Sequence, residues 1–423
     1  MSSLKSYALI DKKGIQPKLY SNDSFYYYSL PGFDERRKPS TILGKNVDSN
    51  KFEVNSGTIL ISKLNPRIRR VWKVLNDEKY KSISSTEFVV LKPHSCNYDF
   101  LFYFLQTDYV YSQLESVAIG STNSHVRFKP EFIYEIKAKF PSQITQRKIA
   151  RILSTVAAVI EKTGAAIAKY KAIKQGMLHD LFTRGIDMSS ACPPERRGKL
   201  RPTYEDAPEL YKESTLGWIP KEWEENPLEL LSTQIGDGIH ATPRYSENTD
   251  FYFVNGNNLS EGQIQIGDTA LCISEEEYKI HFKELNERTI LYSINGTIGN
   301  IAFYKSEKII LGKSACYISC NRNVNLDFIY FFLQSFQVNK FYENELTGST
   351  IKNLSLASVK NTPITIPKDD KEQELIANRI RTITNKIQTE QTYLHKLHQI
   401  KAGLMADLLS GKKKVNVEEE LTN

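Results

Sequence analysis

QRKIARILSTVAAVIEKTGAAIAKYKAIKQGMLHDLFTRG, residues 146–185, is the stretch that decides the fold of this 423-residue chain. Its apolar residues recur at alternating spacings of four and three, which is the period of a coiled coil. The positions that follow this pattern are Ile149, Leu153, Val156, Ile160, Thr163, Ile167, Tyr170, Lys174, Met177 and Leu181. Residues 146–185 are therefore predicted to form one long helix with a pairing face.

The same register returns 227 residues later in the chain. Its positions are Ile376, Ile380, Ile383, Ile387, Glu390, Leu394, Leu397, Lys401, Leu404 and Leu408. The polar interruptions fall at equivalent places, Thr163 with Glu390 and Lys174 with Lys401, and Gly185 and Gly411 lie just past the two helices. This match favours two helices that pair with each other, antiparallel about a pseudo-twofold axis. The alternative is that each helix packs only on its own domain.

A repeat at a similar offset extends through the rest of the chain. Residues 98–106 resemble residues 326–334, and the strand-like run Thr58–Ser62 resembles Thr289–Ser293. The tripeptide Gly-Ser-Thr also occurs twice, at 120–122 and 348–350. A period of about half the chain indicates a duplicated module. The expected fold class is therefore α+β, with two duplicated α/β domains linked by two long antiparallel coiled-coil helices.

The repeat divides the chain into six expected segments. They are a first α/β domain at 1–145, a helical spacer at 146–185, a proline-rich linker at 186–217, a second α/β domain at 218–366, a second helical spacer at 367–412 and a polar tail at 413–423. The linker composition, with four prolines among many charges, predicts an extended arm rather than a packed element.

The composition is that of an ordinary globular protein, with 40% hydrophobic and 25% charged residues. No stretch approaches the ~20 apolar residues that span a bilayer, and the N-terminus lacks a signal-peptide core, so a cytoplasmic protein is expected. The five cysteines are scattered without zinc-site spacing and are predicted to be reduced thiols. They are Cys96, Cys192, Cys272, Cys316 and Cys320.

Charge is distributed unevenly along the chain. The chain carries a net charge of +7; residues 1–145 alone carry +7 and residues 218–366 carry −6, so the first domain is better suited to a polyanion.

The sequence contains no Asn/Asp-Pro-Pro-aromatic tetrapeptide, no phosphate loop and no histidine metal spacing. We therefore expect a recognition protein that is not an enzyme by itself. The alternatives are a stand-alone or fused DNA methyltransferase or nuclease with an unrecognised active site, and a coiled-coil scaffold that never touches DNA.

A basic turn after a strand is the first candidate DNA-binding site, because cations suit phosphate contacts and Arg or Asn can read base edges. Its residues are Lys63, Asn65, Arg67, Arg69 and Arg70. The candidates in the second domain are Asn295 and Thr297 in the aligned turn, and His240, Thr242 and Arg244 in a glycine-containing loop. The competing interpretation is a solvated charged loop, in which case Arg36, Arg37 and Lys38 are the next candidates.

These motifs together resemble the specificity subunit of a type I restriction-modification enzyme. The resemblance rests on LGWIPKEWE at 216–224, DGIHATP at 237–243 and the two repeated helical regions, including Lys174-x-Gly176-x-Leu178-x-x-Leu181. No Gly-Trp-Ile-Pro opens the first module, where 28–35 resembles the family instead. The resemblance implies two target recognition domains, each reading one half of a bipartite DNA target, with no catalytic residue, metal or cofactor in this chain.

The resemblance also implies partners. Two modification subunits would carry S-adenosylmethionine and methylate adenine. Two restriction subunits would use ATP and Mg2+ for translocation and cleavage. The helices would pair through Ile149, Leu153, Val156 and Ile160 on one side and Ile376, Ile380, Ile383 and Ile387 on the other.

Overall fold

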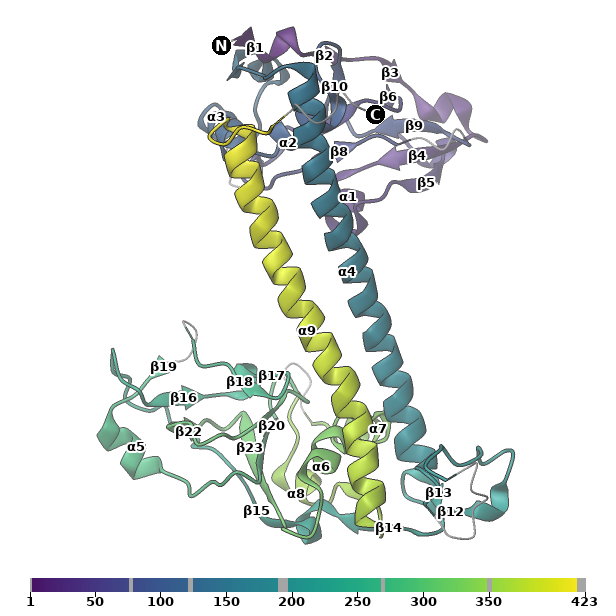
Figure 1. Cartoon of the computed structure of the whole chain (residues 1–423), viewed down its shortest axis with the longest axis vertical. Coiled ribbons are helices and arrows are strands. Elements are labelled where there is room, and N and C mark those ends of the chain that lie inside the picture. Colours follow the sequence, from purple (N-terminus) through teal and green to yellow (C-terminus); the bar gives the residue numbers. More distant parts are fainter. Residues whose placement is uncertain are drawn as a thin grey trace. The chain divides into compact units, whose positions relative to one another are not determined.

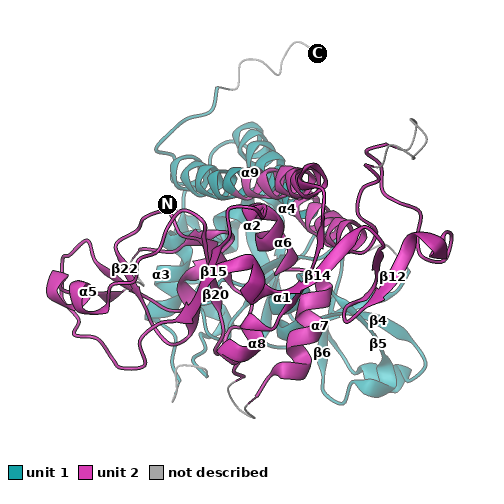
Figure 2. Cartoon of the chain, turned by 90° about the horizontal axis from the view of Figure 1, so that it is seen from below, with its two compact units in different colours: residues 1–165, 392–423 teal, residues 166–391 magenta. Residues whose placement is uncertain are grey.

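The computed structural model describes residues 2–75, 79–120, 125–188, 197–267, 271–347 and 352–416. The chain divides into two compact units, which Figure 2 shows in different colours. Unit 1 comprises residues 1–165 and 392–423, and unit 2 comprises residues 166–391. Two long helices, α4 (Gln143–Arg184) and α9 (Asp370–Leu409), each contribute one part to unit 1 and one part to unit 2.

Unit 1 is built on two larger sheets and the short pair β1 (Ser2–Ser3) with β11 (Lys137–Ala138). The first has the antiparallel order β2-β10-β7-β8, formed by Ala8–Asp11, Phe88–Pro93, Ile59–Ser62 and Val71–Lys73. The second has the order β3-β6-β9-β4-β5, formed by Gly14–Ile15, Lys51–Val54, Lys81–Ser84, Ser24–Tyr28 and Ser40–Leu43, and its β4–β9 pair is parallel. The helices are α1 (Leu30–Arg36), α2 (Tyr98–Phe104) and α3 (Asp108–Ser116) (Figure 1).

Strand β7 lies between two cores, because alternate side chains of a strand point to opposite faces. Ile59 and Ile61 join the core that contains α2 and the start of α4. Leu60 joins a separate core with the aromatic rings of Trp72 and Phe88. A run of four buried residues is therefore explained by a strand covered on both faces.

Unit 2 repeats this plan with the order β15-β23-β20-β21, formed by Ser232–Asp237, Ala315–Cys320, Thr289–Ser293 and Ile301–Phe303. Its second sheet has the order β19-β16-β22, formed by Leu271–Cys272, Tyr252–Val254 and Ile309–Leu311, and again contains one parallel pair. Shorter pairs are β12 (Tyr211–Ser214) with β13 (Gly217–Pro220), β14 (Trp223–Pro227) with β24 (Pro363–Pro367), and β17 (Leu259–Ser260) with β18 (Gln263–Ile264). The helices are α5 (Glu275–His281), α6 (Leu326–Phe332), α7 (Phe336–Glu345) and α8 (Leu356–Lys360). The expected duplication is confirmed.

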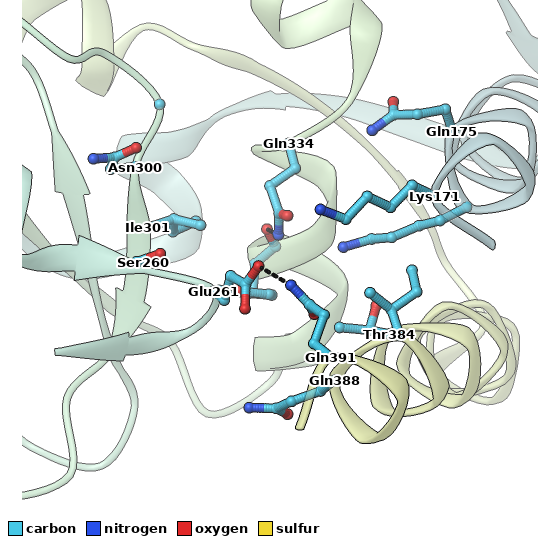
Figure 3. A pocket seen from close by; sticks show the side chains of 14 residues that line it. Lys171, Gln175, Ser260, Glu261, Asn300, Ile301, Gln334, Thr384, Gln388 and Gln391 are labelled. Atoms are coloured by element: carbon cyan, nitrogen blue, oxygen red, sulfur yellow. Dashed lines mark hydrogen bonds between the residues drawn. The ribbon is translucent and has the colours of Figure 1, made fainter. Parts of the chain in front are cut away.

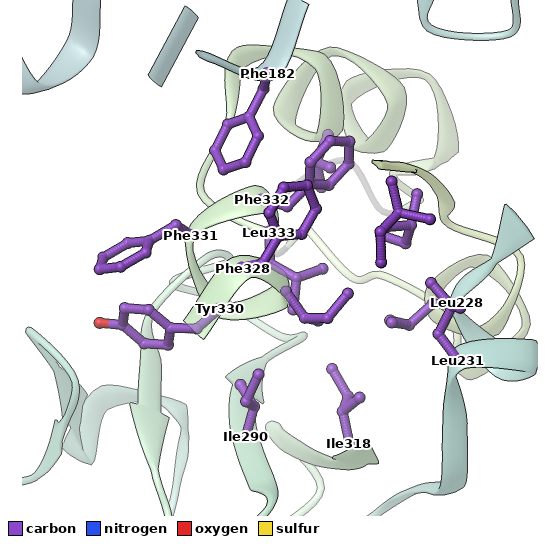
Figure 4. Close-up of a cluster of buried hydrophobic side chains, with 14 of the residues drawn as sticks. Phe182, Leu228, Leu231, Ile290, Ile318, Phe328, Tyr330, Phe331, Phe332 and Leu333 are labelled. Atoms are coloured by element: carbon purple, nitrogen blue, oxygen red, sulfur yellow. The ribbon is translucent and has the colours of Figure 1, made fainter. Parts of the chain in front are cut away.

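The apolar segments that repeat in the sequence form helices α2 and α6. Each begins at an asparagine cap, Asn97 or Asn325, whose side-chain oxygen accepts the third N–H of the helix at 3.0 Å. Figure 4 shows α6 in the core of unit 2, where Phe182 of α4 meets Phe328 and Phe332 edge-on at centroid distances of 5.3 and 5.0 Å. The aromatic rings of α6 therefore hold the end of α4 on this domain.

The two long helices follow the predicted heptad register. All twenty heptad positions are buried or half-buried, whereas most residues between them are exposed. In unit 1, Ile149 and Leu153 near the start of α4 share a core with Leu408 near the end of α9. In unit 2, Leu178 and Leu181 share a core with Ile376 and Ile380. The helices therefore pack antiparallel, as the repeat predicts.

A buried glutamine fixes the start of each long helix on its domain. The Gln146 side chain accepts the Asn97 N–H at 2.8 Å and donates to the Pro141 carbonyl at 2.8 Å. Gln373 makes the same pair of bonds, to the Asn325 N–H at 3.0 Å and the Pro367 carbonyl at 2.9 Å. Each glutamine thus joins the helix cap of its domain to the chain that enters the long helix.

Part of the segment expected to be a linker packs on unit 2. Residues 189–196, including Cys192, lie outside the described residues, but Arg201 is buried and bonds Glu372 of α9 at 2.6 and 3.1 Å. The Glu372 carboxylate also accepts the Ile186 N–H at 2.8 Å and the Trp223 ring N–H at 3.2 Å. We call this group, Arg201, Glu372, Trp223 and the Ile186 amide, the clasp.

The remaining expectations concern the tail, the tripeptide repeat and the thiols. Residues 417–423 of the polar tail, 121–122 of the first tripeptide and all of 348–350 lie outside the described residues. Cys96, Cys272, Cys316 and Cys320 are free thiols. A helix long and apolar enough to cross a membrane does not occur within the described ranges.

Candidate nucleic-acid interface

The basic turn predicted in the first domain connects β7 to β8 at one end of the four-stranded sheet. Backbone bonds shape it: the Lys63 N–H donates to the Glu87 carbonyl at 2.9 Å and the Asn65 N–H to the Val126 carbonyl at 2.7 Å. Asn65 has a left-handed backbone, with φ of 47°, which asparagine tolerates better than most residues. Its side-chain oxygen is buried and finds no partner in the part of the chain that the structure describes.

The cations of this turn have different surroundings. Arg70 is buried and holds Asp34 of α1 through two nitrogens at 2.7 and 2.9 Å, so this guanidinium is committed to the fold. Arg69 is exposed but pairs with Asp108 and lies 5.4 Å from the Tyr111 ring centre. Arg67 is exposed, and neither it nor the half-buried Lys63 pairs with a carboxylate among the described residues. The turn therefore presents Arg67 most openly.

The aligned turn in the second domain connects β20 to β21 and is formed mainly by polar residues and glycine. The Asn295 amide donates to the Asn353 side-chain oxygen at 3.0 Å, whereas Thr297 is exposed. Gly296 and Gly299 have φ of 73° and 97°, so this turn depends on glycine. The second turn thus offers hydroxyl and amide groups where the first offers guanidinium.

The glycine-containing loop of unit 2 lies beside this turn. The Gly238 N–H donates to the Ala315 carbonyl at 3.2 Å and the Ile294 N–H to the Ser314 carbonyl at 2.9 Å, so both segments leave the same end of β23. His240 is exposed and lies 2.8 Å from the Asp237 carboxylate. Thr242 and Arg244 are also exposed. The structure therefore brings Asn295, Thr297 and His240 toward one sheet end, whereas Arg244 precedes Tyr245, which pairs with Ile273 next to β19 of the other sheet.

A polar cavity of about 360 Å³ lies in unit 2 next to this turn, and sequence reasoning did not predict it. Figure 3 shows the hairpin tip Glu261 reaching α9, where the Gln391 amide donates to its carboxylate at 3.0 Å. Glu261 has a left-handed φ of 49°. The lining residues from α4, the β17–β18 tip, the turn, α6 and α9 include Lys171, Gln175, Glu261, Asn300, Gln334 and Gln388. Amides and ammonium groups can position the turn, but they form no nucleophile–base pair.

The clasp and the cavity were missed because both depend on residues distant in sequence. Arg201 and Glu372 are 171 positions apart, and Gln391 and Glu261 are 130 positions apart. The only local signal was the positive charge of Arg201 among the linker prolines. No group of three or more potential metal ligands occurs within the described ranges.

A family model describing the type I restriction modification DNA specificity domain matches residues 3–169 and 220–399. The chain belongs to that family. The two matches cover both domains and most of both long helices. Membership assigns DNA sequence recognition, rather than catalysis, to this specificity chain. It does not favour the alternative of a methyltransferase or nuclease.

Curated relatives and solved structures agree with the family. The MjaVIII specificity subunit of a type I restriction enzyme from Methanocaldococcus jannaschii is 24% identical over 350 residues, 79% of this chain and 75% of its own length. The MjaIX specificity subunit of the same organism is 26% identical over 325 residues, covering 75% and 69%.

Two solved structures show the same fold. The crystal structure of the type I restriction-modification S subunit from M. genitalium aligns with a TM-score of 0.58 at 16% identity, covering 96% of this chain and 95% of that chain. A chain from a structural study of assembly and conformational transition in a type I R-M system aligns with a TM-score of 0.55 at 15% identity, covering 96% of both. These likenesses confirm the fold class.

Proposed function

We propose that this chain reads a bipartite DNA sequence, with residues 1–145 reading one half and residues 218–366 the other, and directs adenine methylation or DNA cleavage by partner subunits. The observation that carries the proposal is the repeated sheet, β2-β10-β7-β8 and β15-β23-β20-β21, with a polar turn at the corresponding end of each copy. Two copies of one module with different turn chemistry suit two different half-sites. The segments 146–185 and 367–412 act as spacers between the half-site readers, and 186–217 joins the two copies.

The two turns support different modes of DNA contact. Arg67 can contact phosphate or pair with guanine, whereas the amide and hydroxyl groups of Asn295 and Thr297 suit base edges or phosphate oxygens. The first domain carries +7 and the second −6, so the first supplies more of the salt-dependent binding. His240, Thr242 and Arg244 add donors to the second site.

The partners that we propose are two modification subunits, which carry S-adenosylmethionine, and two restriction subunits, which use ATP and Mg2+, all in the cytoplasm. An exposed isoleucine followed by an exposed glycine occurs once on each long helix and supports two equivalent docking sites. Ile173 is 41% exposed and Ile400, 227 residues later, is 42% exposed. Each is followed three residues later by an exposed glycine with open space around it, which permits close approach of another helix. Exchanging both isoleucines for Glu should abolish co-purification of modification subunits.

The proposal is tested by exchanging residues 1–145 for the corresponding domain of another family member. Sequencing methylated adenines in a host that expresses the complete system should then show a change in only one half of the target. A change in both halves would contradict one half-site per domain. The exchange of residues 218–366 is the matched control and should change the other half.

The assignment of catalysis to partner subunits has its own test. The purified chain should transfer no methyl group from labelled S-adenosylmethionine to DNA and should not cut DNA. Methyl transfer that persists in the highly purified chain would contradict the assignment of catalysis to partner subunits.

A further inference from the structure

The geometry points to a second DNA-contact site in unit 1, where Arg37 at the end of α1, Lys73 at the end of β8 and Lys401 of α9 together bind a backbone phosphate. This inference rests on the proposed DNA-binding function and extends it to a long helix. None of the candidates expected from the basic turn belongs to this group. We call it the junction site.

The two lysines of the junction site converge on one aromatic ring. The Lys73 ammonium lies 5.6 Å from the centre of the Tyr103 ring, and the Lys401 ammonium lies 5.7 Å from the same centre. Lys73 also lies 4.5 Å from the Phe102 ring centre and pairs with the Asp99 carboxylate. Strand β8, helix α2 and helix α9 therefore bring two cations to one place.

Like charges surround Lys401. Burial lowers the pKa of its ammonium, and the charges of Arg37 and Lys73 lower it further. Asp99 pairs with Lys73, whereas neither Arg37 nor Lys401 forms an ion pair within the described ranges. A phosphate oxygen bound here would relieve this repulsion, because an opposite charge favours the ionised form of each base.

Arg37 occupies a backbone conformation that favours glycine. It caps α1 with φ of 50° and ψ of 32°, and its N–H donates to the Phe33 carbonyl. A side chain disfavours this left-handed region relative to the right-handed one. The guanidinium stacks 5.4 Å from the Phe33 ring centre, yet the residue remains exposed. An exposed cation held at a strained cap indicates a role outside the fold.

Unit 2 contains a matched position with a smaller excess of positive charge. Lys174 is the heptad equivalent of Lys401 and lies 5.7 Å from the Phe331 ring centre, just as Lys401 lies over Tyr103. Burial lowers the pKa of Lys174, the charge of Glu261 raises it, and the like charge of Lys171 lowers it. Each copy thus contains one carboxylate, Asp99 in unit 1 and Glu261 in unit 2, but Lys401 has two further cations beside it and Lys174 has one. The unit 1 copy therefore suits a phosphate better.

The junction site adjoins the basic turn, which favours DNA over other anions. Arg70 ends the turn, and Lys73 lies three residues farther along β8, about 10 Å away in an extended chain. Arg70 also anchors α1 through Asp34, three residues before Arg37. A DNA strand that contacts Arg67 can therefore continue toward Arg37 and Lys401. An acidic segment of a partner protein is the competing occupant.

The test is the salt dependence of random duplex DNA binding by the full chain, measured by fluorescence anisotropy between about 50 and 200 mM salt. Arg37→Gly and Lys401→Gln should each reduce the slope of log affinity against log salt by ~0.9, which is roughly an eightfold loss at 0.1 M salt. Lys401→Arg should retain the slope, and the matched control Lys174→Gln should bind like wild type. Arg37→Gly should also keep or raise the melting temperature, because glycine relieves the strained cap.

The outcomes separate this inference from the proposed function. Wild-type protein that binds no DNA at any salt concentration would overturn both. Wild-type binding with an unchanged slope in Arg37→Gly and Lys401→Gln would overturn the junction site alone. An equal loss in Lys174→Gln would also overturn it, since it would indicate a general charge effect. If Arg37→Gly and Lys401→Gln bind DNA like wild type but no longer co-purify with partner subunits, the cations bind an acidic protein segment. That result would overturn the phosphate assignment.

Discussion

The glycines after the two long helices allow one structural element to be tested in two environments. Gly185 has φ of 65° and Gly411 has φ of 76°, so both require the left-handed backbone that an alanine resists. Their surroundings differ. A Cβ on Gly185 would meet Glu372 Oε1 at 2.4 Å, Arg201 Nη1 at 2.6 Å and Trp223 at 2.7 Å, whereas a Cβ on Gly411 meets nothing within 4 Å.

The expected cost of Gly411→Ala is that of the backbone alone. The left-handed conformation costs roughly 1–2 kcal/mol, and the reduced freedom of the unfolded chain returns about 0.4–1 kcal/mol. A net loss of about 1 kcal/mol follows.

Gly185→Ala should cost much more, because the new methyl group would separate the buried carboxylate of Glu372 from Arg201. Breaking a buried ion pair costs about 3–5 kcal/mol. Together with the backbone term, a loss of about 4–6 kcal/mol in the local stability of unit 2 is expected.

Hydrogen exchange followed by mass spectrometry measures this difference region by region, which suits a chain with two compact units that need not unfold together. In Gly185→Ala, peptides that contain Ile186 and Trp223 should exchange much faster than in wild type, because the Ile186 N–H loses its carboxylate acceptor. The control Gly411→Ala should leave these peptides unchanged. Equal protection of the clasp peptides in both variants would refute the reasoning.

Three further predictions follow from named contacts. Glu372→Ala should destabilise unit 2 by about 3–5 kcal/mol, whereas Glu222→Ala, whose side chain is 61% exposed against the same Arg201, should cost about 0–1 kcal/mol in denaturant unfolding. Arg70→Ala should lower the melting temperature of unit 1, because the Arg70–Asp34 pair is lost. Arg67→Ala should keep that temperature but reduce the salt slope of DNA binding by ~0.9. A lower melting temperature in Arg67→Ala, with a reduced salt slope in Arg70→Ala, would contradict these roles. Four residues inserted after Ala166 add ~6 Å of helix, and the gap in the methylated target should grow by about two base pairs with both half-sites unchanged. An unchanged gap with activity retained would show that the helices do not set it.

The sequence alone predicts the long helices, the duplication and the position of the turns. Heptad spacing is a local property, so Ile149, Leu153, Ile376 and Ile380 identify their own buried face without knowledge of the partner. A repeat at one offset identifies equivalent elements, such as β7 with β20, because homologous copies keep the same order of strands. The motif around Trp218 is also a local pattern of residues, so it indicates the family without knowledge of the fold.

Only the tertiary structure separates residues that look alike in the sequence. Arg67 and Arg70 lie three positions apart in one basic turn, but Asp34 arrives from α1 and commits Arg70 to the fold. Lys174 and Lys401 share a heptad position, but Glu261 approaches one and Arg37 approaches the other. A charged side chain is defined by the charges and solvent around it, and these come from segments far along the chain. The local pattern therefore locates the cations, and the packing of distant elements decides which of them remain available to DNA.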